Sequence, residues 1–202
     1  AAPRALGLSF AALLAGAMLL ATAIAVAWPN LPEIDSLTDY RPRLPLRIYS
    51  ADGVLVGQFG QERRHFTPIE QIPPLLRQAV LATEDASFYE HGGVHYVGVL
   101  RAAIANLHRS RSQGASTITM QVARNFYLPT KKTFTRKFYE MLLALKIEHL
   151  LGKDEIFEIY LNQIYLGQRA HGFAAASGIY FGKPLGALTI AETAMLARCP
   201  ES

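Results

Sequence analysis

Residues 84–93 read Glu-Asp-Ala-Ser-Phe-Tyr-Glu-His-Gly-Gly, and they directly follow an apolar pattern of helical period that opens at Pro74. A second segment, residues 116–121, reads Ser-Thr-Ile-Thr-Met-Gln and comes after Gln-Gly-Ala. Hydroxyl-rich residues behind a glycine can present backbone N–H groups to an anion at the start of a helix. A pair of acidic residues near such a segment predicts an acid–base site beside a phosphate site.

The helical pattern continues through most of the chain beyond these two segments. Apolar residues recur at spacings of three and four, which is the period of an amphipathic helix. We expect helices over residues 74–84, 97–107 and 116–127, from 134 onward, from 153 to a terminal glycine at 167, and over 187–198. Ser116 is a good N-cap for the third helix, and the fourth places Arg136, Lys137 and Glu140 on its more polar faces. The predicted fold class is therefore mainly α.

Ahead of the helices, the sequence predicts a linker and a short β-hairpin. Residues 29–45 contain four prolines and no periodicity, which is typical of an extended linker. Residues 46–59 alternate around Asp52-Gly53, the turn pair of a tight hairpin. We expect two short strands there.

The first 28 residues are strongly apolar. No charged residue occurs between Arg4 and Glu33, and the run Leu6–Trp28 would span roughly 34 Å as a helix, enough for a hydrocarbon core of about 30 Å. A cleaved signal peptide is the alternative, because Ala-x-Ala triplets occur at 21–25, but the run exceeds the usual apolar region of roughly 7–15 residues. A transmembrane helix is the favoured interpretation. With Arg4 inside, everything after residue 29 lies outside the cytoplasm, and either interpretation exports the domain.

Composition sets further bounds. The chain has 202 residues, 50% of them hydrophobic and 18% charged, which suits one main domain. Its single cysteine, Cys199, cannot form an internal disulfide. The net charge of +4 fits lipid, phosphate or nucleic acid equally well. The histidines lack metal-ligand spacing, and there is neither a nucleophile elbow nor a glycine-rich nucleotide loop.

Two groups of residues could carry out chemistry, and each also has an interpretation in which it has no functional role. Glu84 and Asp85 adjoin Phe88 and His91, so desolvation can raise the pKa of a carboxyl group toward that of a working base. The alternative is that both acids merely end a helix. In residues 136–140, Arg and Glu at i,i+4 can form a surface ion pair worth only about 0.3–0.5 kcal/mol. The functional interpretation is that two cations and a carboxylate bind a diphosphate.

Four blocks of the sequence occur together in one order. Glu-Asp-x-x-Phe-x-x-His-x-Gly spans 84–93, Gly-Ala-Ser-Thr-Ile-Thr-x-Gln spans 114–121, Arg-Lys-x-x-Glu spans 136–140, and Lys-Asp-Glu-Ile-x-Glu-x-Tyr-Leu-Asn spans 153–162. In order and spacing they resemble the glycosyltransferase module of class A penicillin-binding proteins, the peptidoglycan glycosyltransferases of family fifty-one. The resemblance extends from about Ile48 to Ala197.

The resemblance implies a lysozyme-like helical domain that polymerises lipid II into glycan strands. In that family the sugar 4-hydroxyl of the acceptor attacks the anomeric carbon of a lipid-diphosphate donor, with inversion. Carried over position by position, Glu84 is expected to be the general base and Glu140 the second catalytic acid, on the donor side. The positions that match residues around the donor or the base are Asp85, His91, Arg101, Ser116, Thr119, Gln121, Arg124, Lys132, Arg136 and Lys137.

The resemblance also sets expectations for organisation and partners. It places a cytoplasmic stub and transmembrane helix over 1–30, the linker and hairpin over 31–60, and the glycosyltransferase domain over 61–202, truncated at its C-terminal end and without a transpeptidase domain. It requires no cofactor, allows Mg²⁺ or Mn²⁺ beside the diphosphate, and involves no metal held by the protein. Expected partners are lipid II, lipid-linked glycan, the membrane and other cell-wall synthesis proteins, but not nucleic acid. The expected location is the bacterial plasma (inner) membrane, single-pass, with the catalytic domain on the periplasmic or extracellular side.

Two other functions stay open at this point. A lysozyme-like glycan hydrolase shares the fold and also uses two carboxylates. A non-catalytic, membrane-anchored scaffold fits a shortened chain. The Arg-Lys block and the apolar N-terminal run favour transfer from a lipid diphosphate.

Overall fold

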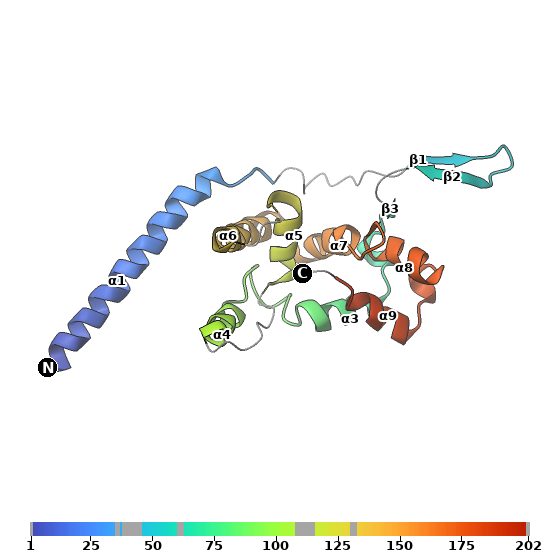
Figure 1. The fold of residues 1–202 in the computed structure, drawn as a ribbon. Coiled ribbons are helices and arrows are strands. Elements are labelled where there is room, and N and C mark those ends of the chain that lie inside the picture. The colour runs from blue at the N-terminus through green and yellow to red at the C-terminus, as the bar shows by residue number, and fades with distance from the viewer. Residues whose placement is uncertain are drawn as a thin grey trace.

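The computed structural model describes residues 2–34, 37, 46–59, 63–107, 116–129 and 133–200, and it is mainly helical, as predicted (Figure 1). The helices are α1 (Ala2–Ala27), α3 (Pro74–Glu84), α4 (Tyr96–Leu107), α5 (Ile118–Tyr127), α6 (Phe134–Leu150), α7 (Lys153–Gln163), α8 (Phe173–Phe181) and α9 (Ile190–Ala197). Short 3-10 turns η1 (Trp28–Asn30), η2 (Ile69–Gln71) and η3 (Leu185–Ala187) separate some of them. The strands are β1 (Leu46–Tyr49), β2 (Leu55–Phe59), β3 (Arg63–Arg64) and β4 (Ala170–His171).

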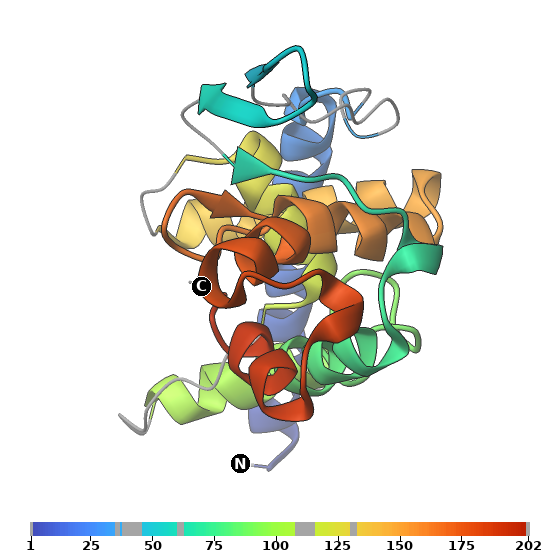
Figure 2. The ribbon, with the colours of Figure 1, turned by 90° about the vertical axis from the view of Figure 1, so that its right-hand side faces the viewer.

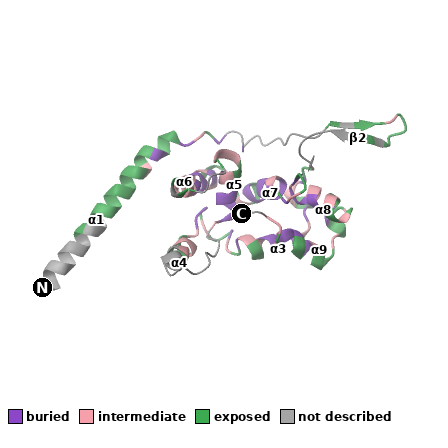
Figure 3. Cartoon of the chain, viewed as in Figure 1, coloured by how far each residue is buried: buried purple, intermediate pink, exposed green. Residues whose placement is uncertain are grey.

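Helix α5 lies at the centre of the helical body. It packs against α6 on one side and α7 on another, while α3 packs against α9. All six residues from Ile118 to Ala123 are buried, so both the apolar and the polar side chains of this helix face other elements. Figure 3 shows buried residues gathered on α5, α6 and α7, and Figure 2 shows α5 passing through the middle of the body. Polar groups on α5 therefore depend on partners inside the protein, although Oε1 of Gln121 has no hydrogen-bond partner among the described residues.

Helix α1 and the hairpin project from this body in different directions (Figure 1). The helical state predicted for the N-terminal run is confirmed over Ala2–Ala27. Across the part of the chain that the structure describes, no helix combines the length and the apolarity that crossing a bilayer demands. A membrane-spanning role for the N-terminal run stays a prediction.

The hairpin is also confirmed. Strands β1 and β2 pair antiparallel, with Ile48 opposite Gly57. The chain reverses at Asp52-Gly53, where Gly53 has φ +78°, and the Ser50 N–H donates to the Val54 carbonyl over 2.8 Å. Glycine suits the turn because it adopts positive φ without steric cost.

The predicted extended linker over residues 29–45 is corrected in its first part. Leu31, Ile34 and Leu37 are buried in the main core, and the Lys146 ammonium donates to the Pro32 carbonyl over 3.1 Å. Prolines remove the helical period, but the apolar side chains between them still gain by leaving water. The rest of the predicted linker, residues 35–36 and 38–45, lies outside the described residues.

Two predicted helix ends are wrong. Thr117, not Ser116, caps α5, because its hydroxyl accepts the Met120 N–H over 3.2 Å. Helix α7 ends at Gln163 rather than at Gly167. Gly167, with φ +85°, instead opens a turn in which its carbonyl accepts the Ala170 N–H over 2.7 Å.

That turn leads into elements the sequence did not reveal. Strand β4 pairs in parallel with β3, and α8 follows it directly. The side-chain amide of Asn162 secures the same region, accepting from the Thr67 N–H over 2.7 Å and donating to the Thr67 carbonyl over 2.9 Å. Asn162 belongs to one of the four sequence blocks, so part of that block maintains the fold.

Candidate active site

Glu84 is the last residue of α3, where the predicted helix delivers it. Within the described residues its carboxylate accepts one side-chain hydrogen bond, from Nε2 of Gln121 on α5, over 2.7 Å. Gln121 is buried, whereas Glu84 is half-buried. A carboxylate with a neutral partner and partial solvent access can still accept a proton, which is what a general base must do.

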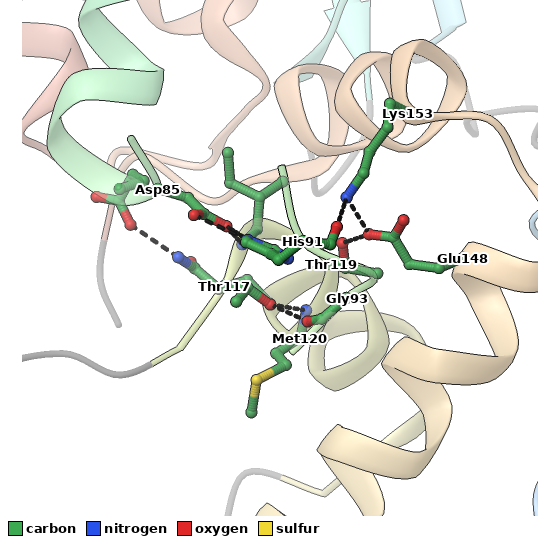
Figure 4. A network of polar contacts seen from close by, with 11 residues as sticks. Asp85, His91, Gly93, Thr117, Thr119, Met120, Glu148 and Lys153 are labelled. Atoms are coloured by element: carbon green, nitrogen blue, oxygen red, sulfur yellow. Dashed lines mark hydrogen bonds and ion pairs between the residues drawn. The ribbon is translucent and has the colours of Figure 1, made fainter. Parts of the chain in front are cut away.

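Asp85, next in the chain, faces the start of α5 (Figure 4). Its carboxylate accepts the Ile118 N–H over 3.1 Å, and Nε2 of His91 lies 3.0 Å from both of its oxygens. A negative charge at a helix N-terminus is favourable because the exposed N–H groups carry partial positive charge. Asp85 therefore fixes the end of α3 to the beginning of α5.

Glu140 is enclosed by cations. Only 1% of its side chain is exposed; Nε of Arg136 lies 3.1 Å from one oxygen, and the Lys137 ammonium donates to the other over 2.8 Å. The expectation that Glu140 lies on a polar helix face is therefore wrong, and its pair with Arg136 is not the exposed surface ion pair of the alternative interpretation. A buried carboxylate must be paired, since an isolated charge is costly away from water.

Lys137 joins this cluster to the start of α5. Its ammonium also donates to the hydroxyl of Ser116 over 2.5 Å, one residue before the N-cap of the helix. The Lys137 side chain is 37% exposed, compared with 10% for Arg136. Of these two cations, Lys137 has the better access to a ligand.

Tyr160 of α7 belongs to the sequence block 153–162 but was assigned no site role, and it lies in the electrostatic range of the site. Burial raises the pKa of its hydroxyl, the charge of Glu84 raises it further, and the Arg124 guanidinium lowers it. The hydroxyl has no hydrogen-bond partner among the described residues. Glu84 and Arg124 thus both act electrostatically on this buried hydroxyl, although the sequence block that contains Tyr160 indicated no role for it.

Thr119 is bonded inside the protein. It is fully buried, and its hydroxyl donates to Glu148 of α6 over 2.6 Å. The same Glu148 oxygen accepts from the Lys153 ammonium over 2.7 Å, and Lys153 also donates to the His91 carbonyl over 2.6 Å (Figure 4). Sequence reasoning assigned no site role to Glu148 or Lys153, because an acid and a base on separate helices show no local spacing signal.

The predicted site residues differ in whether the described contacts bring them together. Helix α5 and the residues before it bring together Glu84, Asp85, His91, Ser116, Gln121, Lys137 and Glu140, through the contacts given above. Arg101 is exposed on α4, and no described contact joins it to them. Lys132 lies outside the described residues. Among the residues that the structure does describe, no three His, Cys, Asp or Glu side chains gather in a way that could hold a metal ion.

The arrangement yields two carboxylates with different surroundings. Glu84 has a neutral amide as its described partner, whereas Glu140 has two cations within ion-pair distance. Different environments give two acids different roles at one pH. The first suits proton transfer, and the second belongs to a cationic cluster that can bind an anionic leaving group.

Comparisons with known proteins identify the family of the chain. The family model described as transglycosylase matches residues 52–202, so the chain belongs to the transglycosylase family. Penicillin-binding protein 1A from Neisseria gonorrhoeae is 56% identical over 197 residues, which are 97% of this chain and 25% of that protein. Penicillin-binding protein 1A from Escherichia coli K12 is 51% identical over 175 residues, 86% of this chain and 21% of that protein.

Among solved structures, penicillin-binding protein 1A from Haemophilus influenzae matches with 28% sequence identity and a TM-score of 0.39, covering 79% of this chain and 14% of that chain. The chain spans about a quarter of the length of the curated relatives it matches. The resemblance to the glycosyltransferase module of class A penicillin-binding proteins is confirmed.

Replacing Asp85 tests its bond to the α5 N-terminus. Asp85→Ala leaves the Ile118 N–H without its acceptor and removes the anion at the helix start, which we expect to cost about 2–3 kcal/mol of unfolding free energy. Urea unfolding of the full chain in detergent measures it. Glu90→Ala, at an exposed position of the same segment, is the control and should change stability by less than about 0.5 kcal/mol. Equal effects of the two substitutions would contradict the assigned bond.

Proposed function

We propose that this chain is a peptidoglycan glycosyltransferase that polymerises lipid II into glycan strands. The observation that carries the proposal is the pair of unlike carboxylates: Glu84 with an amide partner, and Glu140 within a cationic cluster that includes Lys137. Membership of the transglycosylase family and the similarity to penicillin-binding proteins 1A support it.

In the proposed reaction, Glu84 takes the proton of the acceptor sugar 4-hydroxyl. The hydroxyl oxygen then forms a bond to the anomeric carbon of the donor while the bond from that carbon to the diphosphate breaks, with inversion at the carbon. The electron pair leaves with the diphosphate. Negative charge grows on the leaving group, so preorganised cations lower the barrier.

The cluster around Glu140 provides those cations. Lys137 is partly exposed and its ammonium already bridges Ser116 and Glu140, so a diphosphate oxygen could join as a further acceptor. Arg136 adds charge beside Glu140, and Arg101, Arg124 and Lys132 remain proposed contacts of the donor or acceptor. Asp85 and His91 are proposed to support Glu84. Gln121 holds the Glu84 carboxylate, and Thr119, whose hydroxyl donates to Glu148, supports α5.

We also propose that Mg²⁺ or Mn²⁺ can bind beside the diphosphate and that other cell-wall synthesis proteins are partners.

Two substitutions test this function against glycan hydrolysis. Glu84→Gln should lower the rate of lipid II polymerisation about 10²–10⁴-fold, because the base is lost, with little change in substrate binding. Lys137→Met should lower it about 10²-fold, because a charge contact that strengthens as the diphosphate leaves is removed. Glu70→Gln and Lys183→Met, changes of the same type outside the proposed site, should retain the wild-type rate.

Each variant is assayed both on lipid II and on finished, undecorated glycan. A hydrolase has no diphosphate to stabilise, so its activity would not respond to Lys137→Met. Wild type that cleaves glycan, ignores lipid II and loses nothing on that substitution would establish the hydrolase. Absence of both activities would favour the scaffold.

We propose further that α1 anchors the chain in the bacterial plasma membrane in a single pass, with the catalytic domain outside the cytoplasm. The support is the absence of charge between Arg4 and Glu33, together with the 26-residue length of the helix. Such a helix measures about 39 Å, against about 30 Å of hydrocarbon. The protein should stay with membranes after alkaline carbonate washing. Recovery in the soluble fraction, with a new N-terminus near Trp28, would establish a cleaved signal peptide instead.

A further inference from the structure

The ammonium of Lys153 binds the short segment 85–93 beside the site (Figure 4). It donates to the His91 carbonyl over 2.6 Å and stands 4.4 Å from the centre of the Phe88 ring, which is fully buried. It also donates to Glu148 over 2.7 Å. One cation on α7 therefore connects the segment 85–93 to α6.

The local electrostatics of the helices do not favour this ion pair. Lys153 is the first residue of α7, and Glu148 lies in the last turn of α6. A helix N-terminus attracts anions and a C-terminus attracts cations, so each charge stands at the end that disfavours it. The pair between Lys183 and Glu192 differs, because Glu192 is in the first turn of α9, where an acid is favourable. The placement of Lys153 and Glu148 must be explained by what they hold together.

What they hold is the segment that follows Glu84. Asp85 binds the start of α5, the His91 carbonyl binds Lys153, and the Gly93 carbonyl accepts the Thr117 hydroxyl over 2.5 Å. The path is tight at its far end, because a Cβ on Gly93 would come within 2.9 Å of the Ala144 carbonyl oxygen. Of the three bonds, the one from Lys153 comes from a charged donor and reaches the middle of the segment.

We propose that Lys153 is a positioning residue for Glu84. By binding the His91 carbonyl while Glu148 and Phe88 hold its ammonium, Lys153 fixes the course of residues 85–93 and thereby the direction of the neighbouring Glu84 carboxylate. Glu148 is in turn held by the Thr119 hydroxyl on α5. This inference rests on the proposed function, because it assigns Lys153 to the geometry of the proposed base. Lys153 acts through the segment rather than on the substrate.

Exchanging the charges of Lys153 and Glu148 distinguishes a positioning role for Lys153 from an ion pair that only stabilises the fold. The double substitution Lys153→Glu/Glu148→Lys keeps opposite charges on α6 and α7 and puts each at the helix end that favours it. However, a carboxylate at position 153 cannot donate to the His91 carbonyl, and an ammonium at position 148 cannot accept from Thr119. If the pair only stabilises the fold, the exchange restores function. If Lys153 positions the segment, it does not.

The experiment uses the full chain with Lys153→Met, Lys153→Arg, the double exchange and Lys183→Met. The last is a matched control, since Lys183 also pairs with a glutamate over 2.7 Å, away from the segment. For each variant, kcat and KM are measured on lipid II, amide hydrogen exchange is followed over residues 86–93, and the unfolding temperature is recorded.

We expect Lys153→Met to lower kcat about 10–10²-fold with KM nearly unchanged, because a misdirected catalytic group slows chemistry rather than binding. Hydrogen exchange over residues 86–93 should become faster. Lys153→Arg should recover most of kcat, and Lys183→Met should change neither readout. The double exchange should unfold near the wild-type temperature and still show low kcat and fast exchange.

Recovery of kcat and slow exchange in the double exchange would overturn the proposal, as would wild-type kcat in Lys153→Met. A rise in KM with kcat unchanged would also overturn it, by assigning Lys153 to substrate binding. If the wild-type chain does not act on lipid II, the proposed function fails. Hydrogen exchange then decides the positioning role by itself, and unchanged protection in Lys153→Met would reject it.

Discussion

The burial of α5 is the constraint on which the site depends. A helix whose first six residues are all enclosed cannot satisfy its polar groups with water, so the protein must provide acceptors and donors for them. The Ile118 N–H uses Asp85, the Gln121 amide uses Glu84, and the Thr119 hydroxyl uses Glu148. Each acceptor is a carboxylate from another element. The requirement to satisfy one buried helix thus gathers the acids of the site around it.

The same helix keeps the two proposed catalytic acids in different surroundings. Glu84 meets α5 through the side chain of Gln121, on the body of the helix, whereas Glu140 reaches its start through Lys137 and Ser116. Arg136 and Lys137 therefore pair with Glu140, whereas the described hydrogen-bond partner of Glu84 is a neutral amide. This separation allows one acid to receive a proton while charge on a leaving diphosphate is stabilised elsewhere.

Helical periodicity predicted much of the fold, and its failures have physical causes. α3 and α4 match their predicted ranges within about one residue because each has an apolar stripe, and Pro74 marks the start of α3. α8 was missed because its residues, Phe-Ala-Ala-Ala-Ser-Gly-Ile-Tyr-Phe, are apolar around most of the helix and leave no stripe to detect. The burial of Leu31, Ile34 and Leu37 was missed because prolines hide the pattern of a segment that still packs into the core.

At the site, the sequence blocks identified which residues are present but not how far each is buried or which residues each one contacts. Local spacing suggested a surface pair for Arg136 and Glu140, and only tertiary packing makes that carboxylate 1% exposed. Lys153 and Glu148 meet across two helices, so no pattern within either helix predicts their contact. Once a helix is known to be buried, its sequence shows which of its polar groups need hydrogen-bond partners inside the protein. Burial itself is a property of the whole fold.

The most direct test of the account is a crystal structure of the full chain with a non-reactive analogue of the lipid-diphosphate sugar donor. The account predicts a diphosphate oxygen within hydrogen-bond distance of the Lys137 ammonium, on the Glu140 side of α5. The Glu84 carboxylate should keep its bond to Gln121 and face the position of an incoming hydroxyl. A diphosphate bound away from Lys137, or one contacting Glu84 directly, would contradict the assigned division of roles between the two acids.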